Sequence, residues 1–173
     1  MNEKLGIRNV VLAGLFTAMI FVVTGYFPRL PTIRGYIHIG DSVIYIAACL
    51  LNQPGAAISA ALGGFLADAL TGYVVWAPYT ALIKAALTVS FTALGGKMLS
   101  LRNILAALAA FPITIGGYYL AAWMITGDKF APLAEVPLNA VQAGGSMLIY
   151  IVVAAGIDRA GLKNRLTGIG GRK

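Results

Sequence analysis

Five polar side chains that could bind a ligand stand inside otherwise apolar segments of this 173-residue chain. They are two carboxylates, Asp41 and Asp68, one ammonium group, Lys84, and two amides, Asn139 and Gln142. A charged side chain deep in hydrocarbon costs about 2.5–3.5 kcal/mol on insertion scales, so such groups usually face a cavity or one another. The pattern therefore indicates either hydrogen bonding to a ligand or structural pairing.

The composition identifies the environment of these residues. The chain is 59% hydrophobic and only 11% charged, whereas about a quarter of the residues in a soluble domain are charged. The runs at 10–27 and 104–125 are almost continuously apolar, without the alternation that a barrel needs. We therefore predict a single-domain, all-α integral membrane protein. The net charge of +7 fits loops that face the cytoplasm better than a nucleic-acid partner.

Six segments are long enough to cross about 30 Å of hydrocarbon. The second is the weakest, because Asn52, Gln53 and Pro54 end it early, and five spans with a re-entrant segment are the alternative. No cleavable signal peptide is expected. The predicted helices are 9–27, 37–52, 55–72, 77–96, 103–126 and 136–157, followed by a basic cytoplasmic tail at 158–173.

The distribution of lysine and arginine predicts the orientation. With both ends in the cytoplasm, only Arg29, Arg34 and Lys129 fall in outer loops. The cytoplasmic segments then carry Lys4, Arg8, Lys97, Arg102, Arg159, Lys163, Arg165, Arg172 and Lys173.

In this topology the polar residues gather in the outer half of the bilayer. Asp68 lies about 20 Å up the third helix, and Lys84 lies about 10 Å below the outer end of the fourth. The two could form a structural pair or line a cavity. Asn139 and Gln142 share one face near the outer end of the sixth helix. We predict a polar cavity that opens outward and is closed towards the cytoplasm.

The remaining candidates each have two interpretations. Asp41 either caps the second helix or pins the preceding loop, or it contacts ligand directly. His38 is expected to be exposed in the first outer loop, with ligand contact as the alternative. The aromatic residues near the outer end either form an interfacial belt or stack on a flat ligand; they are Tyr73, Trp76, Tyr79, Tyr118, Tyr119 and Trp123.

Small residues recur at helical spacing on the first helix. Gly14 and Ala18 are four apart, as are Ala13 and Thr17. Such faces let helices approach closely, within one chain or between chains. All four residues are predicted to take part in docking to a partner.

The motifs of nucleotide hydrolysis, zinc proteases and serine hydrolases do not occur in the sequence. We expect no catalytic residue, no metal site and no cofactor. Active transport by this chain would need energy from a partner or an ion gradient.

Three segments resemble one family: GYIHIGDSVIYIAACLL, GAAISAALGGFLADALTGYVVWAPYTALIKAAL and VPLNAVQAG. They are similar to the substrate-binding S components of energy-coupling factor (ECF) vitamin transporters, and most similar to the riboflavin-transporter-like branch with its hydroxymethylpyrimidine, pyridoxine and queuosine-salvage relatives. The resemblance covers about 8–157. It implies a six-helix subunit that captures a vitamin from outside and then topples in the membrane.

The resemblance also implies partners and site residues. A membrane-embedded T component carrying two ATPase subunits would dock on the first helix, where Gly14 and Ala18 match an A-x-x-x-A motif with glycine in the first place. Asn139 and Gln142 match a ligand-facing pair, residues 34–41 match a gate, and residues 73–79 match the loop between helices three and four. The implied location is the cytoplasmic membrane of a prokaryote.

Several alternatives stay open at this stage. A self-sufficient secondary carrier would need internal repeats, and a membrane-embedded enzyme would need paired acids or a nucleophile. Neither signal is found. The aromatic, amide and carboxylate groups suit a flat heterocycle, such as a pyrimidine, pyridoxine, flavin or queuine-like base. The predicted ligand-binding set is Arg34, His38, Asp41, Asp68, Tyr73, Trp76, Tyr79, Lys84, Tyr119, Trp123, Asn139 and Gln142.

Overall fold

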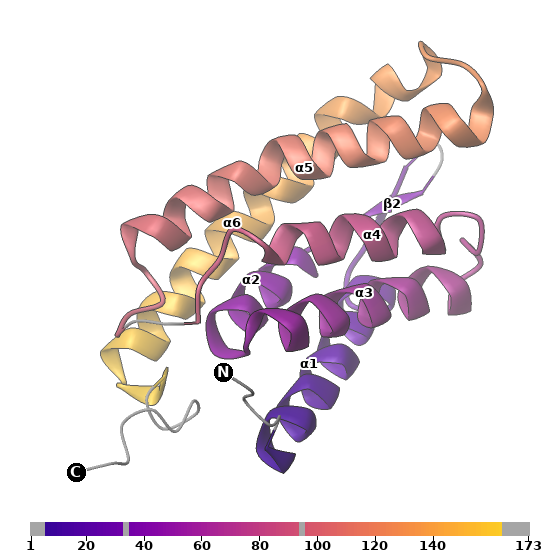
Figure 1. The fold of residues 1–173 in the computed structure, drawn as a ribbon. Helices are drawn as coiled ribbons and strands as arrows, with labels where there is room; N and C mark the ends of the chain where they lie inside the picture. The colour runs from indigo at the N-terminus through magenta and orange to yellow at the C-terminus, as the bar shows by residue number, and fades with distance from the viewer. Residues whose placement is uncertain (1–5, 33–34, 94–95, 164–173) are drawn as a thin grey trace.

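The computed structural model describes residues 6–32, 35–93 and 96–163. Within these ranges six α-helices form one bundle, which confirms the all-α class and the number of helices (Figure 1). In chain order the elements are α1 (Ile7–Gly25), β1 (Leu30–Pro31), β2 (Tyr36–Ile37), α2 (Asp41–Leu50), α3 (Gln53–Leu70), α4 (Ala77–Thr88), α5 (Leu101–Thr126), the 3-10 helix η1 (Ala131–Glu135) and α6 (Val136–Arg159).

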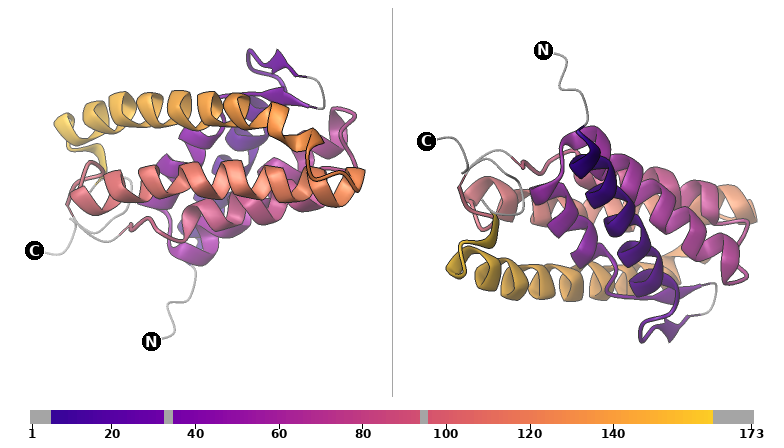
Figure 2. Two further views of the ribbon diagram at one scale, coloured as in Figure 1. Left: turned by 90° about the horizontal axis from the view of Figure 1, so that it is seen from above. Right: turned by 90° about the horizontal axis from the view of Figure 1, so that it is seen from below.

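Three of the helices are long and apolar enough to cross a bilayer, judged within the described ranges. They are α1, α5 and the continuous stretch Ala131–Arg159 that joins η1 to α6. Figure 2 shows α5 and α6 running side by side along the bundle, while α1 packs across α3.

Helices α2 and α4 are shorter than the sequence predicts. At 1.5 Å per residue, the ten residues of α2 span about 15 Å, half of the hydrocarbon thickness. It starts at Asp41 rather than at residue 37, because Tyr36 and Ile37 pair with β1. Helix α4 ends at Thr88 rather than at residue 96, and the following turn is held where the Thr92 backbone N–H donates to Asn103 Oδ1.

Local signals fix several of the helix ends. Asn52 caps α3 by accepting a hydrogen bond from the Gly55 backbone N–H at 3.1 Å, with Pro54 in the first turn. Ser100 caps α5 in the same way, accepting from the Asn103 N–H. Gly127 closes α5 in a left-handed conformation, with φ +70°.

The two ends of the bundle differ. The start of α1 and the end of α6 lie at one end, and the β1–β2 hairpin and η1 lie at the other (Figure 1). At the first end, the Asp158 carboxylate accepts hydrogen bonds from the Met98 and Leu99 backbone N–H groups. The Tyr150 hydroxyl donates to the Met98 carbonyl at 2.8 Å. This end is therefore closed by paired polar groups as well as by the apolar side chains that the sequence predicts.

Candidate binding cavity

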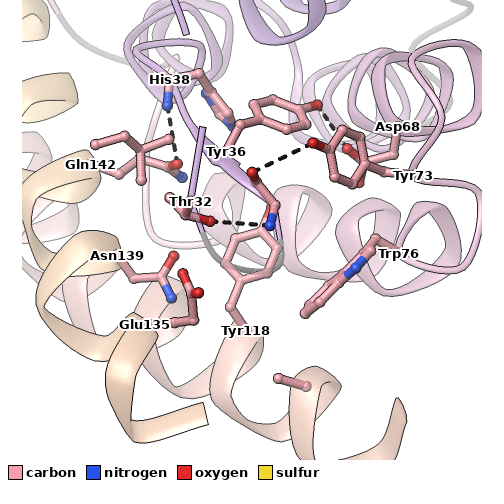
Figure 3. A pocket seen from close by; sticks show the side chains of 13 residues that line it. Thr32, Tyr36, His38, Asp68, Tyr73, Trp76, Tyr118, Glu135, Asn139 and Gln142 are labelled. Atoms are coloured by element: carbon pink, nitrogen blue, oxygen red, sulfur yellow. Dashed lines mark hydrogen bonds between the residues drawn. The ribbon is translucent and has the colours of Figure 1, made fainter. Parts of the chain in front are cut away.

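A cavity lies at the hairpin end of the bundle, between the hairpin, the C-terminal end of α3, the α3–α4 connection, α5 and the start of α6 (Figure 3). The space that its walls enclose, with the solvent in the open mouth included, is about 550 Å³. The residues that line it are Thr32, Gly35, Tyr36, Ile37, His38, Asp68, Tyr73, Trp76, Tyr118, Ala122, Glu135, Asn139 and Gln142.

The hairpin forms one wall of the cavity and is held by side-chain hydrogen bonds. Thr32 accepts from the Gly35 backbone N–H at 3.0 Å through its hydroxyl, and the Tyr73 hydroxyl reaches the Gly35 carbonyl at 3.5 Å. The Tyr36 hydroxyl donates to Asp68 Oδ1 at 2.7 Å, which ties β2 to α3. The hairpin is therefore attached to the bundle through two tyrosines.

The ring of Tyr36 is enclosed by other side chains. The Arg29 guanidinium lies 4.6 Å from its centroid, and the Tyr73 ring lies 5.0 Å away at a tilt of 58°. Burial raises the pKa of the Tyr36 phenol well above its usual range, and the Asp68 charge raises it further. Tyr36 therefore remains a hydrogen-bond donor at any physiological pH.

A buried network closes the floor of the cavity. Lys84 Nζ donates to Asp41 Oδ1 at 2.5 Å, and both side chains are fully buried. The Gln142 amide donates to Asp41 Oδ2 at 3.1 Å, and its oxygen accepts from the His38 backbone N–H at 3.3 Å. The network joins α4, α2, α6 and the turn before α2.

This network corrects the predicted pair of Asp68 and Lys84. The ammonium group of Lys84 is bonded to Asp41, and Asp68 is bonded to Tyr36. The depth of each residue along its helix placed Asp68 and Lys84 at the same level in the membrane. That estimate did not include the hairpin, whose Tyr36 is the partner of Asp68. Among the described residues, the Asp41 carboxylate bonds to Lys84 and Gln142 and not to the backbone at the start of α2, so the capping interpretation is wrong. Its bond to Gln142, which also holds the His38 N–H, agrees with the interpretation that Asp41 pins the preceding loop.

His38 is buried rather than exposed, with only 6% of its surface accessible. Its Nδ1 atom accepts a hydrogen bond from the Gly40 backbone N–H at 3.0 Å, which assigns the ring proton to Nε2. Burial lowers the pKa of the imidazole to about 3, and the Lys84 charge lowers it further, against the opposing effect of Asp41. The ring is neutral at physiological pH.

The structure separates the predicted site residues into three groups. His38, Asp68, Tyr73, Trp76, Asn139 and Gln142 line the cavity. Asp41 and Lys84 lie beneath it in the floor network, and Arg34 falls outside the described residues. Three further predicted residues do not line the cavity: Tyr79, Tyr119 and Trp123. The Tyr119 hydroxyl donates to the Lys129 carbonyl, and Trp123 is 42% exposed.

Four polar or aromatic lining residues were absent from the predicted set: Thr32, Tyr36, Tyr118 and Glu135. Tyr118 was recognised only as an aromatic residue at the outer end of its helix; the structure places it against the cavity, with Lys84 Nζ 5.2 Å from its ring centroid. The hairpin carries Thr32 and Tyr36, and its signal in the sequence is the pair Pro31 and Gly35, residue types that punctuate chain segments. Glu135 directly precedes α6, and an acid at the N-terminus of a helix is common for electrostatic reasons, so it gave no signal of a site.

The two small-residue pairs on α1 face different surroundings. The Ser59 hydroxyl donates to the Ala13 carbonyl, and a Cβ at Gly63 would lie 2.9 Å from the Thr17 carbonyl, so this face packs against α3. A Cβ at Gly14 would meet nothing within 4 Å, and Ala18 is exposed.

The lining of the cavity mixes aromatic and polar side chains. It combines tyrosine and tryptophan faces with hydrogen-bonding carboxylates and amides. Within the described ranges, no cluster of histidine, cysteine or acidic residues is arranged to hold a metal ion. A helical membrane bundle with an aromatic-lined cavity at one end and a closed opposite end is a membrane-embedded binding protein.

The comparisons with known proteins specify the class. The chain matches the family described as "ECF-type riboflavin transporter, S component" over residues 4–159, and it belongs to that family. The resemblance to ECF S components is thus confirmed, and the branch within them stays a prediction. A comparison with curated proteins gave no match.

Proposed function

We propose that this chain captures a small, water-soluble heterocyclic vitamin or vitamin precursor from outside the cell. ATP-driven uptake would then be powered by a separate T component and two ATPase subunits. The location would be the cytoplasmic membrane of a prokaryote, with the hairpin end facing outward. Family membership supports the S-component role.

The observation that carries the proposal is the position of the cavity. It lies at the end of the bundle opposite the start of α1 and the end of α6, and the lysine and arginine distribution assigns those helix ends to the cytoplasm (Figure 1). The Asp41–Lys84 network closes its floor. A cavity that opens only outward suits a subunit that binds first and relies on a partner for release.

The exposed α1 face supports a proposal for the docking site. Gly14 and Ala18 present small side chains on an open surface, whereas Ala13 and Thr17 lie on the face that packs against α3. We therefore assign contact with the T component to the Gly14 and Ala18 face, where a partner helix could approach closely.

Native mass spectrometry of the purified protein tests the capture step. The expected result is a retained heterocyclic compound in the absence of ATP. In proteoliposomes, uptake should require the T component and both ATPases. Uptake driven by an ion gradient with this chain alone would contradict the proposal and favour a secondary carrier.

A further inference from the structure

Helices α2 and α6 pack together and carry polar side chains at matching intervals along their interface. Each helix has three of these residues, spaced four apart, and all six side chains are buried. They are Asp41, Tyr45 and Cys49 on α2, and Gln142, Ser146 and Tyr150 on α6. A buried polar group costs free energy unless it has a hydrogen-bond partner, so each of the six needs one.

Contacts at both ends of this set fix the alignment of the two helices. In the outer pair, the Gln142 amide donates to Asp41 Oδ2 at 3.1 Å. In the inner pair, Cys49 Sγ lies 3.4 Å from the Tyr150 hydroxyl oxygen. Eight residues separate the two contacts on each helix, so the helices run in the same direction and keep one register. The remaining residue of each helix lies midway between the contacts, and these two residues form a middle pair.

The inner and outer pairs are hydrogen-bonded to protein groups. The Tyr150 hydroxyl donates to the Met98 carbonyl at 2.8 Å, so the contact with Cys49 uses the thiol as donor. The Asn103 amide in turn donates to Cys49 Sγ at 3.3 Å. Lys84 completes the outer pair in the floor network. Both ends of the interface are therefore satisfied.

The middle pair, Tyr45 and Ser146, differs. Both hydroxyl oxygens are buried and have no hydrogen-bond partner among the described residues. The Phe91 ring stacks on the Tyr45 ring with centroids 5.1 Å apart, and the Tyr150 ring packs edge-on at 5.9 Å, so Tyr45 is held in place. Ser146 does not donate to a carbonyl of its own helix, as Thr126 does on α5. Two hydroxyls therefore lie between satisfied pairs without a protein partner of their own.

We propose that the middle pair is a binding site for buried water, with one water molecule bridging the Tyr45 and Ser146 hydroxyls beneath the cavity floor. A hydroxyl donates one hydrogen bond and accepts others, and water does both, so a bridging water satisfies the two oxygens at once. An apolar molecule would leave both hydroxyls unpaired. A hard cation such as Ca²⁺ takes about six to eight oxygen ligands, of which this pair supplies two.

This inference goes beyond the proposed function, because it concerns the interior of the bundle and not the ligand. With the bridging water, all three pairs are hydrogen-bonded, from Gln142, which lines the cavity, to Tyr150 near the closed end. The short helix α2 is then held against α6 by a polar contact at every turn.

Thermal unfolding of the detergent-purified full chain tests whether the two hydroxyls are bonded. Tyr45→Phe and Ser146→Ala should each lower the melting temperature by about 2–4 °C, which corresponds to the loss of one hydrogen bond. The double variant should lose less than the sum, because the two residues share one water. A dry, unpaired hydroxyl gives the opposite sign, since its removal relieves a cost. An unchanged or raised melting temperature in Tyr45→Phe, or additive losses in the double variant, would overturn the inference.

The matched control is Ser59→Ala. Ser59 is as buried as Ser146, but its hydroxyl donates directly to the Ala13 carbonyl of α1 at 2.9 Å. Its removal should lower the melting temperature by a similar amount. Combined with Tyr45→Phe, the two losses should add, because Ser59 faces α1 and shares no partner with Tyr45.

X-ray radiolysis with mass spectrometry separates a bridging water from a direct hydrogen bond between the two hydroxyls. Radicals formed from an ordered water label the side chain beside it, even where that side chain is buried. Tyr45 should be labelled much faster than Phe16, a buried aromatic residue of α1, with the exposed Tyr26 as the positive reference. Labelling of Tyr45 no faster than that of Phe16 would overturn the inference, and coupled losses of stability would then mean a direct bond.

Discussion

Lys84 on α4 donates a 2.5 Å hydrogen bond to Asp41 at the first residue of α2, and neither side chain is exposed. Two charges that would be costly alone in an apolar bundle thereby neutralise one another. Because Gln142 binds the second oxygen of Asp41 and also holds the turn at His38, the pair connects the cavity floor to the hairpin side of the site.

Removing either partner of this pair should destabilise the protein strongly. Asp41→Asn or Lys84→Met leaves a buried group without its counter-charge, and the expected loss is about 3–5 kcal/mol of unfolding free energy. The double variant should lose less than the sum of the two. Thermal and denaturant unfolding in detergent measure this, with the exposed Lys129→Met as the control. Strict additivity would contradict the pairing.

Asp68→Asn should have a smaller effect on stability than Asp41→Asn. The amide oxygen of asparagine can still accept the Tyr36 hydroxyl, and the ammonium group of Lys84 keeps its own partner. The same unfolding measurements compare the two variants. An equal loss in both would mean that Asp68 also neutralises Lys84.

The two amides of α6 should respond differently to truncation. Gln142→Ala removes the partner of the His38 N–H and one partner of Asp41, so both stability and ligand affinity should fall. Asn139→Ala should lower affinity by about five- to a hundredfold with the melting temperature unchanged. Binding and melting curves for each variant check this. Wild-type affinity in Asn139→Ala would exclude that residue from the site.

The glycines Gly14 and Gly63 should respond in opposite ways to substitution. A Cβ at Gly63 would lie 2.7 Å from Ile20 Cγ2, so Gly63→Ala should destabilise the bundle by about 1–3 kcal/mol. A Cβ at Gly14 meets open space, so Gly14→Leu should leave stability and ligand binding unchanged. It should, however, reduce co-purification with the T component. Retention of the complex in Gly14→Leu would place the docking face elsewhere.

Stability should decrease at acidic pH because of His38. Its pKa is about 3 in the folded state and about 6.5 when unfolded, so the unfolded chain binds more protons between these values. The contribution is complete above pH 6.5 and decreases as the pH falls towards 3, with a slope that approaches 1.4 kcal/mol per pH unit.

The matched variant for this pH dependence is His38→Asn. Asparagine can accept the Gly40 N–H across the same two-residue turn but has no proton to gain. Its melting temperature should depend less on pH between 6.5 and 4 than that of the wild type. Parallel pH profiles for the two proteins would show that His38 does not titrate in this way.

The sequence alone determined the environment, the helical class and the end of the bundle that carries the polar residues. Long apolar runs indicate segments that lie in a membrane. Such segments are helical, because the backbone N–H and C=O groups in hydrocarbon must form their hydrogen bonds within the same segment. Depth along a helix follows from 1.5 Å per residue, so the clustering of Asn139, Gln142 and Trp76 near one end could be predicted.

The tertiary structure decided which of these groups meet. Asp41 meets Lys84 because α2 packs against α4 and because each helix is rotated so that these side chains face one another. Residue spacing in the sequence fixes neither the packing nor the rotation. The hairpin supplies Tyr36 to Asp68 through a contact between residues far apart in the chain. Glu135 became a candidate only because the fold brings it into the cavity lining, with its Oε1 atom buried and without a partner among the described residues.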